Sequence, residues 1–451
     1  MRETIHIYHT NDLHSHFEHW PRIRDFLKLR KQHHENEGET VYLFDIGDHV
    51  DRWHPLSEAT LGKGNVDLLN EAGYDAVTIG NNEGITLDYD DLNSLYDEAR
   101  FDVIVGNLLD SSSERPGWAD THRIYHTHSG MKIGVIGLTA YFKPFYKALG
   151  WNITSPMEEL EKLVHSLQGS VDMIILLSHL GIRDDEMIGE RLPGIDVVLG
   201  AHTHHVLPEG KDVNGTMLGA AGKYGHYVGH MMIEVDTATK QVTGKKARLY
   251  GQGELPPVKD EEKEKVEWIR KGEELLQQEV TQLTQSFPVD WFQASPLPNL
   301  LCDALVDWCG ADCGFLNSGL LIDGLHEGVV TKQDLHRILP HPINPCLIRM
   351  KGAELKEIIK QTRNEDWPHL EVKGLGFRGK VMGRFEYSNI HFKDKDILIG
   401  NRPIEPGKIY KLALPDMFTF GHFFPDLQRL EKKYFMPEFL RDVLEWKFKS
   451  K

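Results

Sequence analysis

The sequence predicts an α/β fold for residues 1–255, arranged as a two-sheet β-sandwich flanked by helices. Short apolar runs that read as buried strands alternate with helical stretches, an order typical of α/β proteins. Helices are expected over 22–38 and 155–170, the second opened by Ser155, Pro156 and two glutamates, as a capped helix should be. Residues 216–236 read as two strands joined by glycine-rich turns, consistent with extra antiparallel strands of such a sandwich.

A change of composition after residue 255 predicts further parts of the 451-residue chain, which is long enough for two or three cores. Residues 256–289 are expected to connect two domains, with one long charged helix over 256–287. Its apolar stripe is Val266, Ile269, Leu275, Leu276 and Val280. Residues 290–451 are predicted as a second, α+β domain, in which 298–321 reads as a helix followed by a strand.

Polar residues with metal-binding side chains follow five of the apolar runs, at the point where each run ends. They are Asp12, His14, Asp48, Asn81, His179, His202 and His204. Asp12 and His14 are spaced i and i+2, so an extended segment points both side chains to one face. Taken singly, each residue also reads as a turn residue, a solvated loop residue or a hydrogen-bonded core histidine. Their repeated position after buried strands favours one site at the edge of a sheet.

The same segments resemble the motifs of the calcineurin-like metallophosphoesterases and, within them, of the 5′-nucleotidase family. They are HTNDLHSHFE at 9–18, GD at 47–48, GN at 80–81, SHLG at 178–181 and GAHTHH at 200–205. The resemblance implies an α/β/β/α metallophosphoesterase domain and a C-terminal 5′-nucleotidase-type domain for substrate specificity. It implies two divalent ions, one held by Asp12, His14, Asp48 and His204 and the other by Asp48, Asn81, His179 and His202.

Carboxylates, imidazoles and one amide suit manganese, zinc or iron, and no cysteine is among these residues. The resemblance implies hydrolysis of a small-molecule phosphate ester, most simply a nucleotide monoester, by attack of a hydroxide that bridges the two ions. Such ions lie about 3.5–4 Å apart and stabilise both the attacking and the leaving oxygen. Asp48 would bridge them.

One departure from the family pattern affects catalysis. The family motif GNHE reads Gly80-Asn81-Asn82-Glu83 here, so Asn82 replaces a histidine that is credited with stabilising the transition state or protonating the leaving oxygen. An amide can donate a hydrogen bond but cannot act as a general acid near neutral pH. Asn82 and Asp48 are therefore the candidate catalytic residues, and His16 and His49 are candidate substitutes for the lost histidine.

A second departure affects substrate recognition. The arginine that the family carries after its Asn-Gly turn is missing from NSGLLIDG at 317–324, and the late aromatic segment is LPDMFTFGHFFPDL at 414–427. The candidate substrate-binding residues are His369, Phe423 and Phe424. Packing of the phenylalanines in the core is an equally open interpretation.

Two other functions remain open on the sequence. The loss of the histidine is compatible with a metal- and nucleotide-binding protein that has weak or no turnover. The same pair of ions would also serve a cyclic-nucleotide or dinucleotide phosphodiesterase.

Charge and cysteine content limit the partners and the compartment. A formal net charge of −17 disfavours nucleic acid and anionic membranes as partners, whereas bound cations reverse the local sign for a small phosphate ester. Neither a signal peptide nor an apolar run of ~18 residues is evident. Cys309 and Cys313 lack a second pair at zinc-finger spacing, so these and Cys302 and Cys346 are expected to be reduced packing thiols in the cytoplasm. The oligomeric state is not predicted.

Overall fold

The computed structural model describes residues 2–394 and 396–450. The chain forms two compact units, residues 1–272 and 273–451, and each unit is described by itself. The boundary between them falls inside the segment that was expected to connect two domains.

The first unit contains two six-stranded sheets. One has the order β14-β13-β1-β2-β3-β4, with strands Gln241–Gly251, Tyr227–Asp236, Arg2–Thr10, Thr40–Asp45, Ala76–Val77 and Asp102–Val103. Strand β1 pairs antiparallel with β13 and parallel with β2, so it lies in the middle of the sheet. Strand β3 is shorter than the apolar run at 74–81 suggested, because the chain turns there into the short helix α4, Asn81–Thr86.

The other sheet has the order β11-β12-β10-β9-β7-β6. Its strands are Lys211–Val213, Thr216–Gly219, Val197–Gly200, Met173–Ser178, Lys132–Leu138 and His122–His126. Strands β12, β10, β9 and β7 are parallel and buried, whereas β11 and β6 pair antiparallel at the two edges. A separate antiparallel pair is formed by β5 and β8, Leu108–Leu109 and Asn152–Ile153.

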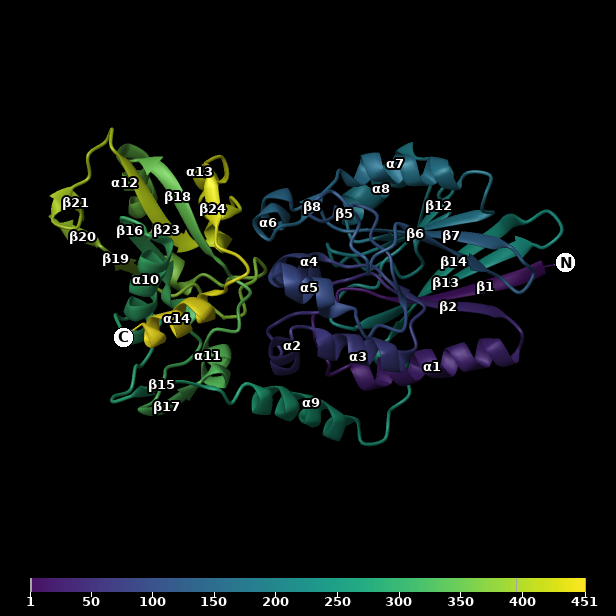
Figure 1. Cartoon of the computed structure of the whole chain (residues 1–451), viewed down its shortest axis with the longest axis horizontal. Coiled ribbons are helices and arrows are strands. Elements are labelled where there is room, and N and C mark those ends of the chain that lie inside the picture. Colours follow the sequence, from purple (N-terminus) through teal and green to yellow (C-terminus); the bar gives the residue numbers. More distant parts are fainter. Residues whose placement is uncertain (1, 395, 451) are drawn as a thin grey trace. The chain divides into compact units, whose positions relative to one another are not determined.

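Helices cover the outer faces of both sheets (Figure 1). On the side of β1 and β2 lies α1, Trp20–Asn36, and against β7, β10 and β12 lie α7 and α8, Pro156–Leu167 and Ile182–Arg191. The remaining helices of this unit are α2, α3, α5 and α6, Pro55–Thr60, Lys63–Ala72, Tyr89–Leu95 and Lys143–Ala148. One core lies between the two sheets and another between the second sheet and α7 and α8. The predicted two-sheet sandwich flanked by helices is confirmed.

The helix expected over 256–287 is shorter than predicted. Helix α9 spans Glu261–Leu275, and Glu279–Leu283 forms strand β15, which pairs antiparallel with β17, Gly328–Thr331. The prediction was wrong because pairing with a distant strand outweighs local helical periodicity, which a sequence pattern cannot register. The stripe divides accordingly: Val266, Ile269 and Leu275 are exposed, while Leu276 and Val280 are buried.

The second unit is α+β, as predicted. Its main sheet has the order β19-β16-β23-β18-β24, with strands Phe385–Ser388, Cys313–Asn317, Ile409–Pro415, Pro345–Lys351 and Lys432–Tyr434. A smaller sheet contains β20, β21 and β22, Ile390–Lys393, Asp396–Ile399 and Arg402–Pro403. The helices are α10 to α14, Pro296–Cys309, Lys332–Ile338, Gly352–Gln361, Pro425–Gln428 and Leu440–Lys449.

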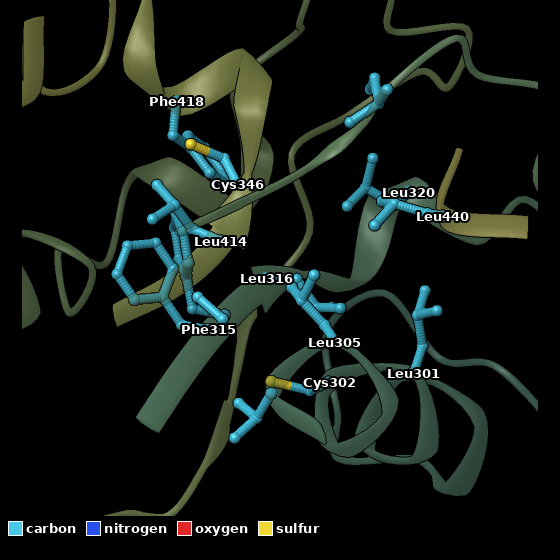
Figure 2. Packing of buried hydrophobic residues seen from close by; sticks show 14 of the residues in the cluster. Leu301, Cys302, Leu305, Phe315, Leu316, Leu320, Cys346, Leu414, Phe418 and Leu440 are labelled. Carbon is cyan, nitrogen blue, oxygen red and sulfur yellow. The ribbon is translucent and has the colours of Figure 1, made fainter. Parts of the chain in front are cut away.

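The core of the second unit packs α10 against the main sheet, and α14 packs against α10. Leu305 of α10 lies beside Leu316 of β16 (Figure 2), in the same buried cluster as Leu301, Cys302 and Phe315. All four cysteines are free and buried, which confirms them as packing residues.

Candidate metal centre

The loops after β1 and β2 are tied together by backbone hydrogen bonds. Asp12 N donates to Gly47 O at 3.0 Å, and His14 N donates to Asp48 O at 2.8 Å. Five of the seven predicted ligands have a left-handed backbone, with φ between 50° and 70°: Asp12, His14, Asp48, His202 and His204. Such conformations are costly for residues other than glycine and are concentrated at functional sites, where the surrounding structure enforces them.

Gly80 allows the loops to approach closely. A Cβ atom at this position would lie 2.1 Å from Asp48 Oδ1 and 2.5 Å from His179 Cε1. No side chain fits there without displacing two of the predicted ligands. The glycine of the GN motif is therefore required by packing around Asp48.

Six of the seven predicted ligands form two compact groups. Asp12, His14 and His204 make up the first group, and Asp48, His179 and His202 the second; within each, the donor atoms lie within 4.8 Å of one another. In the first group His204 Nε2 lies 3.4 Å from Asp12 Oδ1 and 3.2 Å from His14 Nε2. The imidazole rings converge at steep angles, 90° between His14 and His204 and 54° between His179 and His202.

Asp48 faces both groups. Its Oδ2 lies 3.3 Å from His179 Nε2 and 3.7 Å from His14 Nε2, while its Oδ1 accepts a hydrogen bond from Asn82 N at 2.7 Å. One carboxylate oxygen is thus directed between the histidines of the two groups.

The donor atoms fit divalent ions. His179 Nδ1 lies 2.7 Å from Ile46 O, a carbonyl that can only accept, so Nδ1 carries a proton and Nε2 is the nitrogen left for an ion. Among the described residues, buried Asn81 Oδ1 has no hydrogen-bond partner, and the polar neighbour of buried His179 Nε2 is the Asp48 carboxylate, 3.3 Å away. Buried polar atoms without partners are costly, and coordination of a cation would satisfy both.

The carboxylates make the site strongly attractive to positive charge. Burial acts to raise the pKa of Asp48, but His179 and His14 hold that pKa well below its usual range. Burial alone would lower the pKa of His179, yet the Asp48 carboxylate raises it to about 10. His202, where burial and the neighbouring His179 act together, has its pKa lowered to about 4 and is a neutral donor at pH 7.

Comparison with known proteins agrees with this geometry. Residues 5–206 match the calcineurin-like phosphoesterase model, and residues 278–423 match the model of the 5′-nucleotidase C-terminal domain. The chain is 46% identical over 459 residues to YunD of Bacillus subtilis, an uncharacterized metallophosphoesterase, and the match covers 99% of each chain. The chain belongs to the calcineurin-like metallophosphoesterases of the 5′-nucleotidase family.

More distant relatives share both parts of the chain. The 5′-nucleotidase of Rattus norvegicus is 24% identical over 494 residues, covering 92% of this chain and 82% of the relative. The crystal structure of a 5′-nucleotidase from Staphylococcus aureus, itself described as putative, superposes with a TM-score of 0.69 at 17% identity. That match covers 100% of this chain and 97% of the other, which shows a common fold.

Membership of the family makes this metallophosphoesterase a metal-dependent phosphoester hydrolase that uses divalent ions. No helix among the described residues is long and apolar enough to cross a membrane.

Glu83 supports the site and was not predicted to. Its carboxylate accepts hydrogen bonds from three backbone N–H groups, those of Asp48 at 3.0 Å, Val50 at 2.8 Å and Gly80 at 2.8 Å. It therefore joins the loop after β2 to the start of α4. Its place in the motif, two residues after Asn81, was the available signal.

Asn82, the residue that replaces the family histidine, is buried beside a predicted ligand. Its Nδ2 donates to Val50 O at 3.0 Å and lies 3.0 Å from His14 Nδ1. Of the two suggested substitutes, His49 is 2% exposed and its burial lowers its pKa to about 3, so it is no proton donor at neutral pH. His16 is half-buried and packs against Tyr224, with ring centroids 3.8 Å apart and the rings tilted by 34°, and Tyr224 in turn contacts the ring of His14.

The predicted substrate residues of the second unit differ in exposure. Phe424 is fully buried among Phe315, Phe418 and Trp367, so it offers no ring face to a ligand. Phe424 is therefore a core residue, the alternative interpretation given above. Phe423 is also buried, at 8% exposed. The exposed His369 stacks on Phe292 at 4.8 Å and 19°, and Phe292 is 49% exposed. Phe292 was missed because it lies outside every family motif quoted above.

A third group, His6, His34 and His230, also has nitrogens within 4.8 Å of one another. Ring orientation distinguishes it from the other two. The rings of His6 and His34 are 3.8 Å apart and 18° from parallel. Because an imidazole lone pair lies in the ring plane, an ion at about 2.0–2.1 Å from each nitrogen cannot lie in both planes. These side chains form a stacked, hydrogen-bonded layer in which His6 Nδ1 lies 3.0 Å from His230 Nε2.

Proposed function

We propose that this metallophosphoesterase hydrolyses nucleotide monoesters with a pair of divalent ions held on either side of Asp48. The observation that carries the proposal is the position of Asp48 Oδ2, 3.3 Å from His179 Nε2 and 3.7 Å from His14 Nε2. A carboxylate that faces two convergent ligand groups is suited to bridge two cations and to offset their mutual repulsion.

Each ion would have four protein ligands. One set is Asp12, His14, Asp48 and His204, and the other is Asp48, Asn81, His179 and His202. The unpartnered Oδ1 of Asn81 and the approach of His179 Nε2 to Asp48 support the second set. Imidazole, carboxylate and amide donors suit Mn²⁺, Zn²⁺ or Fe²⁺. Bound ions of this kind position the phosphoryl group, lower the pKa of a water and stabilise the charge of attacking and leaving oxygens.

The chain's own residues prepare the site for those ions. Asp12 Oδ2 accepts a hydrogen bond from Asn11 Nδ2 at 2.7 Å and another from the backbone N–H of His202 at 3.1 Å. These two bonds fix the orientation of the Asp12 carboxylate. Ile46 O fixes His179, and Asn82 N fixes Asp48. Ligands held in this way need little reorganisation when ions bind.

A nucleotide is the proposed substrate because the relatives at 24% identity are 5′-nucleotidases and the matching C-terminal domain is present. In the second unit, the exposed Phe292 and His369 are the proposed residues for stacking on a base. Phe292 also lines a cavity of about 320 Å³ with Val289, Asp290, Trp291, Ile322 and Asp323. We also propose a cytoplasmic location, which the four free, buried thiols support.

The test is a screen of the purified chain with Mn²⁺ against nucleoside monophosphates, cyclic nucleotides, dinucleotides and sugar phosphates, measured as product release. Nucleoside monophosphates should be the best substrates, and chelator should abolish turnover. Asp67→Asn serves as the control for variants of the metal centre and should keep full turnover, since Asp67 is exposed on α3 of the same unit. Preference for a cyclic nucleotide or dinucleotide would contradict the monoester assignment, and preference for a sugar phosphate would contradict the nucleotide.

The role of the second unit is tested by His369→Ala. We expect a higher KM for a nucleoside monophosphate, by about 5–10-fold for a lost stacking contact of about 1 kcal/mol, and an unchanged KM for p-nitrophenyl phosphate. His391→Ala is the control, because His391 is also exposed in the second unit. Equal effects on both substrates would contradict base stacking at His369.

A further inference from the structure

The two nitrogens of His14 face different surroundings. Nε2 lies 3.8 Å from Asp12 Oδ1, 3.7 Å from Asp48 Oδ2 and 3.2 Å from His204 Nε2. On the opposite side of the ring, Nδ1 lies 3.4 Å from Asp51 Oδ2 and 3.0 Å from Asn82 Nδ2. The proposed ion-binding nitrogen and the supporting contacts are therefore separated by the ring itself.

Asp51 is held in place by its own loop. It is 1% exposed, its Oδ1 accepts a hydrogen bond from Trp53 N at 3.2 Å, and its N–H donates to Ser15 Oγ at 2.8 Å. Trp53 Nε1 in turn donates to His14 O at 2.7 Å, so backbone and side chain of His14 are supported by the same short segment. A carboxylate buried to this degree needs a hydrogen-bond donor or a positive charge beside it. His14 Nδ1–H is a donor that serves this need.

Asn82 lies beside the same nitrogen as Asp51. Its Nδ2 donates to Val50 O, its backbone N–H donates to Asp48 Oδ1, and its O accepts from Thr86 Oγ1 at 2.5 Å. Asn82 is 8% exposed. Its Nδ2 can only donate and the Asp51 carboxylate accepts, so His14 Nδ1 pairs with Asn82 when it carries the lone pair and with Asp51 when it carries the proton.

We propose that Asp51 is a positioning residue of the metal centre, which accepts the Nδ1 proton of His14 and thereby leaves the Nε2 lone pair free for one ion. Asn82 Nδ2 then keeps its hydrogen bond to Val50 O. A carboxylate behind a metal-binding histidine fixes its tautomer and raises its basicity, and removing such a partner typically weakens metal binding about 10–100-fold. The inference rests on the proposed function, because it concerns one of the two proposed ions.

The experiment measures Mn²⁺ binding to the full-length chain by calorimetry and by the signal of free Mn²⁺ in electron paramagnetic resonance. Asp51→Asn should weaken one of two ions about 10–100-fold and leave the other within a few-fold. Asp97→Asn, an exposed residue of the same unit, is the matched control and should bind both ions like the wild type.

A double-mutant cycle distinguishes positioning of His14 from a general effect on the fold. If Asp51 acts through His14, then Asp51→Asn adds no further loss of affinity in a His14→Ala background. Equal weakening of both ions, or additive losses in the cycle, would overturn the proposal, as would unchanged binding in Asp51→Asn. Should the Asp51→Asn chain fail to fold, Asp51→Glu provides the same cycle, with partial recovery expected because the carboxylate is kept. A wild-type chain that binds fewer than two ions would instead refute the proposed function.

Discussion

Two histidine-rich regions of the first unit have similar distances between their nitrogens but different ring orientations. In the metal centre the rings meet at 54° and 90°, and a buried carboxylate lies between them. In the layer between the first sheet and α1, His6, His34 and His230 stack, and Tyr8 stacks on His230 at 4.1 Å and 8°. Imidazole nitrogens that converge beside carboxylates attract a cation, whereas parallel imidazole rings stack face to face and form hydrogen bonds with one another.

The position in the sheet explains the difference. His6 and Tyr8 lie on one face of β1 and alternate with Ile5 and Ile7, which face the core between the sheets. The rings are therefore confined in a layer under α1, where they pack flat. The proposed ligands of the candidate metal centre follow the ends of strands, five of the seven have a left-handed backbone, and the donor atoms of six converge in two groups.

The largest expected difference is between the carboxylates of the two regions. Asp48→Asn should reduce turnover by at least about 10²–10³-fold, the range for losing a preorganised electrostatic group, and should lower the content of both ions. Glu39→Gln removes the carboxylate beside His34 and His6 and should change neither quantity. Turnover with nucleoside monophosphates and elemental analysis provide the measurements. Full activity in Asp48→Asn would contradict the claim that only the first of these two regions binds the catalytic ions.

The loss of one ligand at the edge of the centre should have a smaller effect. His204 has a side chain that is 31% exposed and belongs to the first group only. His204→Ala should weaken one ion by at least about 10-fold, the lower end of what losing an orienting partner costs, and spare the other. His205→Ala, its exposed neighbour, is the control. Calorimetric titration with Mn²⁺ decides, and loss of both ions together would mean that the two groups are not separate sites.

Acid should lower the free energy of unfolding of the chain, because the stacked layer holds histidines in the neutral form. Burial, together with neighbouring cationic groups, lowers the pKa of His6 to about 4 and that of His230 to about 2, against 6.5 for a free histidine. The unfolded chain then binds more protons below about pH 6.5, so stability falls from there toward pH 4. The slope approaches about 1.4 kcal/mol per pH unit for each histidine that stays neutral.

The matching variant is His230→Phe, studied in chelator so that no ion contributes. Its urea midpoint should fall less steeply between pH 7 and 5 than that of the wild type. His33→Phe, at an exposed position beside His34, should keep the wild-type slope. Identical slopes in wild type and His230→Phe would show that His230 is not held neutral.

The position of the proposed ligands at the strand ends could be predicted from the apolar runs. A polar residue within three residues of the end of a buried strand, as Asp12, Asp48 and His179 are, must lie at a sheet edge. The contacts of Asp51 and the gathering of His6, His34 and His230 could not be predicted, because they depend on side-chain direction and on three distant elements. Phe424 was ambiguous because an aromatic residue in a core and one in a binding site have the same sequence signature.

The most direct test of the central claim is anomalous scattering from crystals grown with Mn²⁺. The account predicts two peaks about 3.5–4 Å apart, one on each side of Asp48. One should contact Asp12, His14 and His204, and the other Asn81, His179 and His202, with no peak between His6, His34 and His230. A single peak at Asp48, or a peak within the stacked histidines, would contradict it.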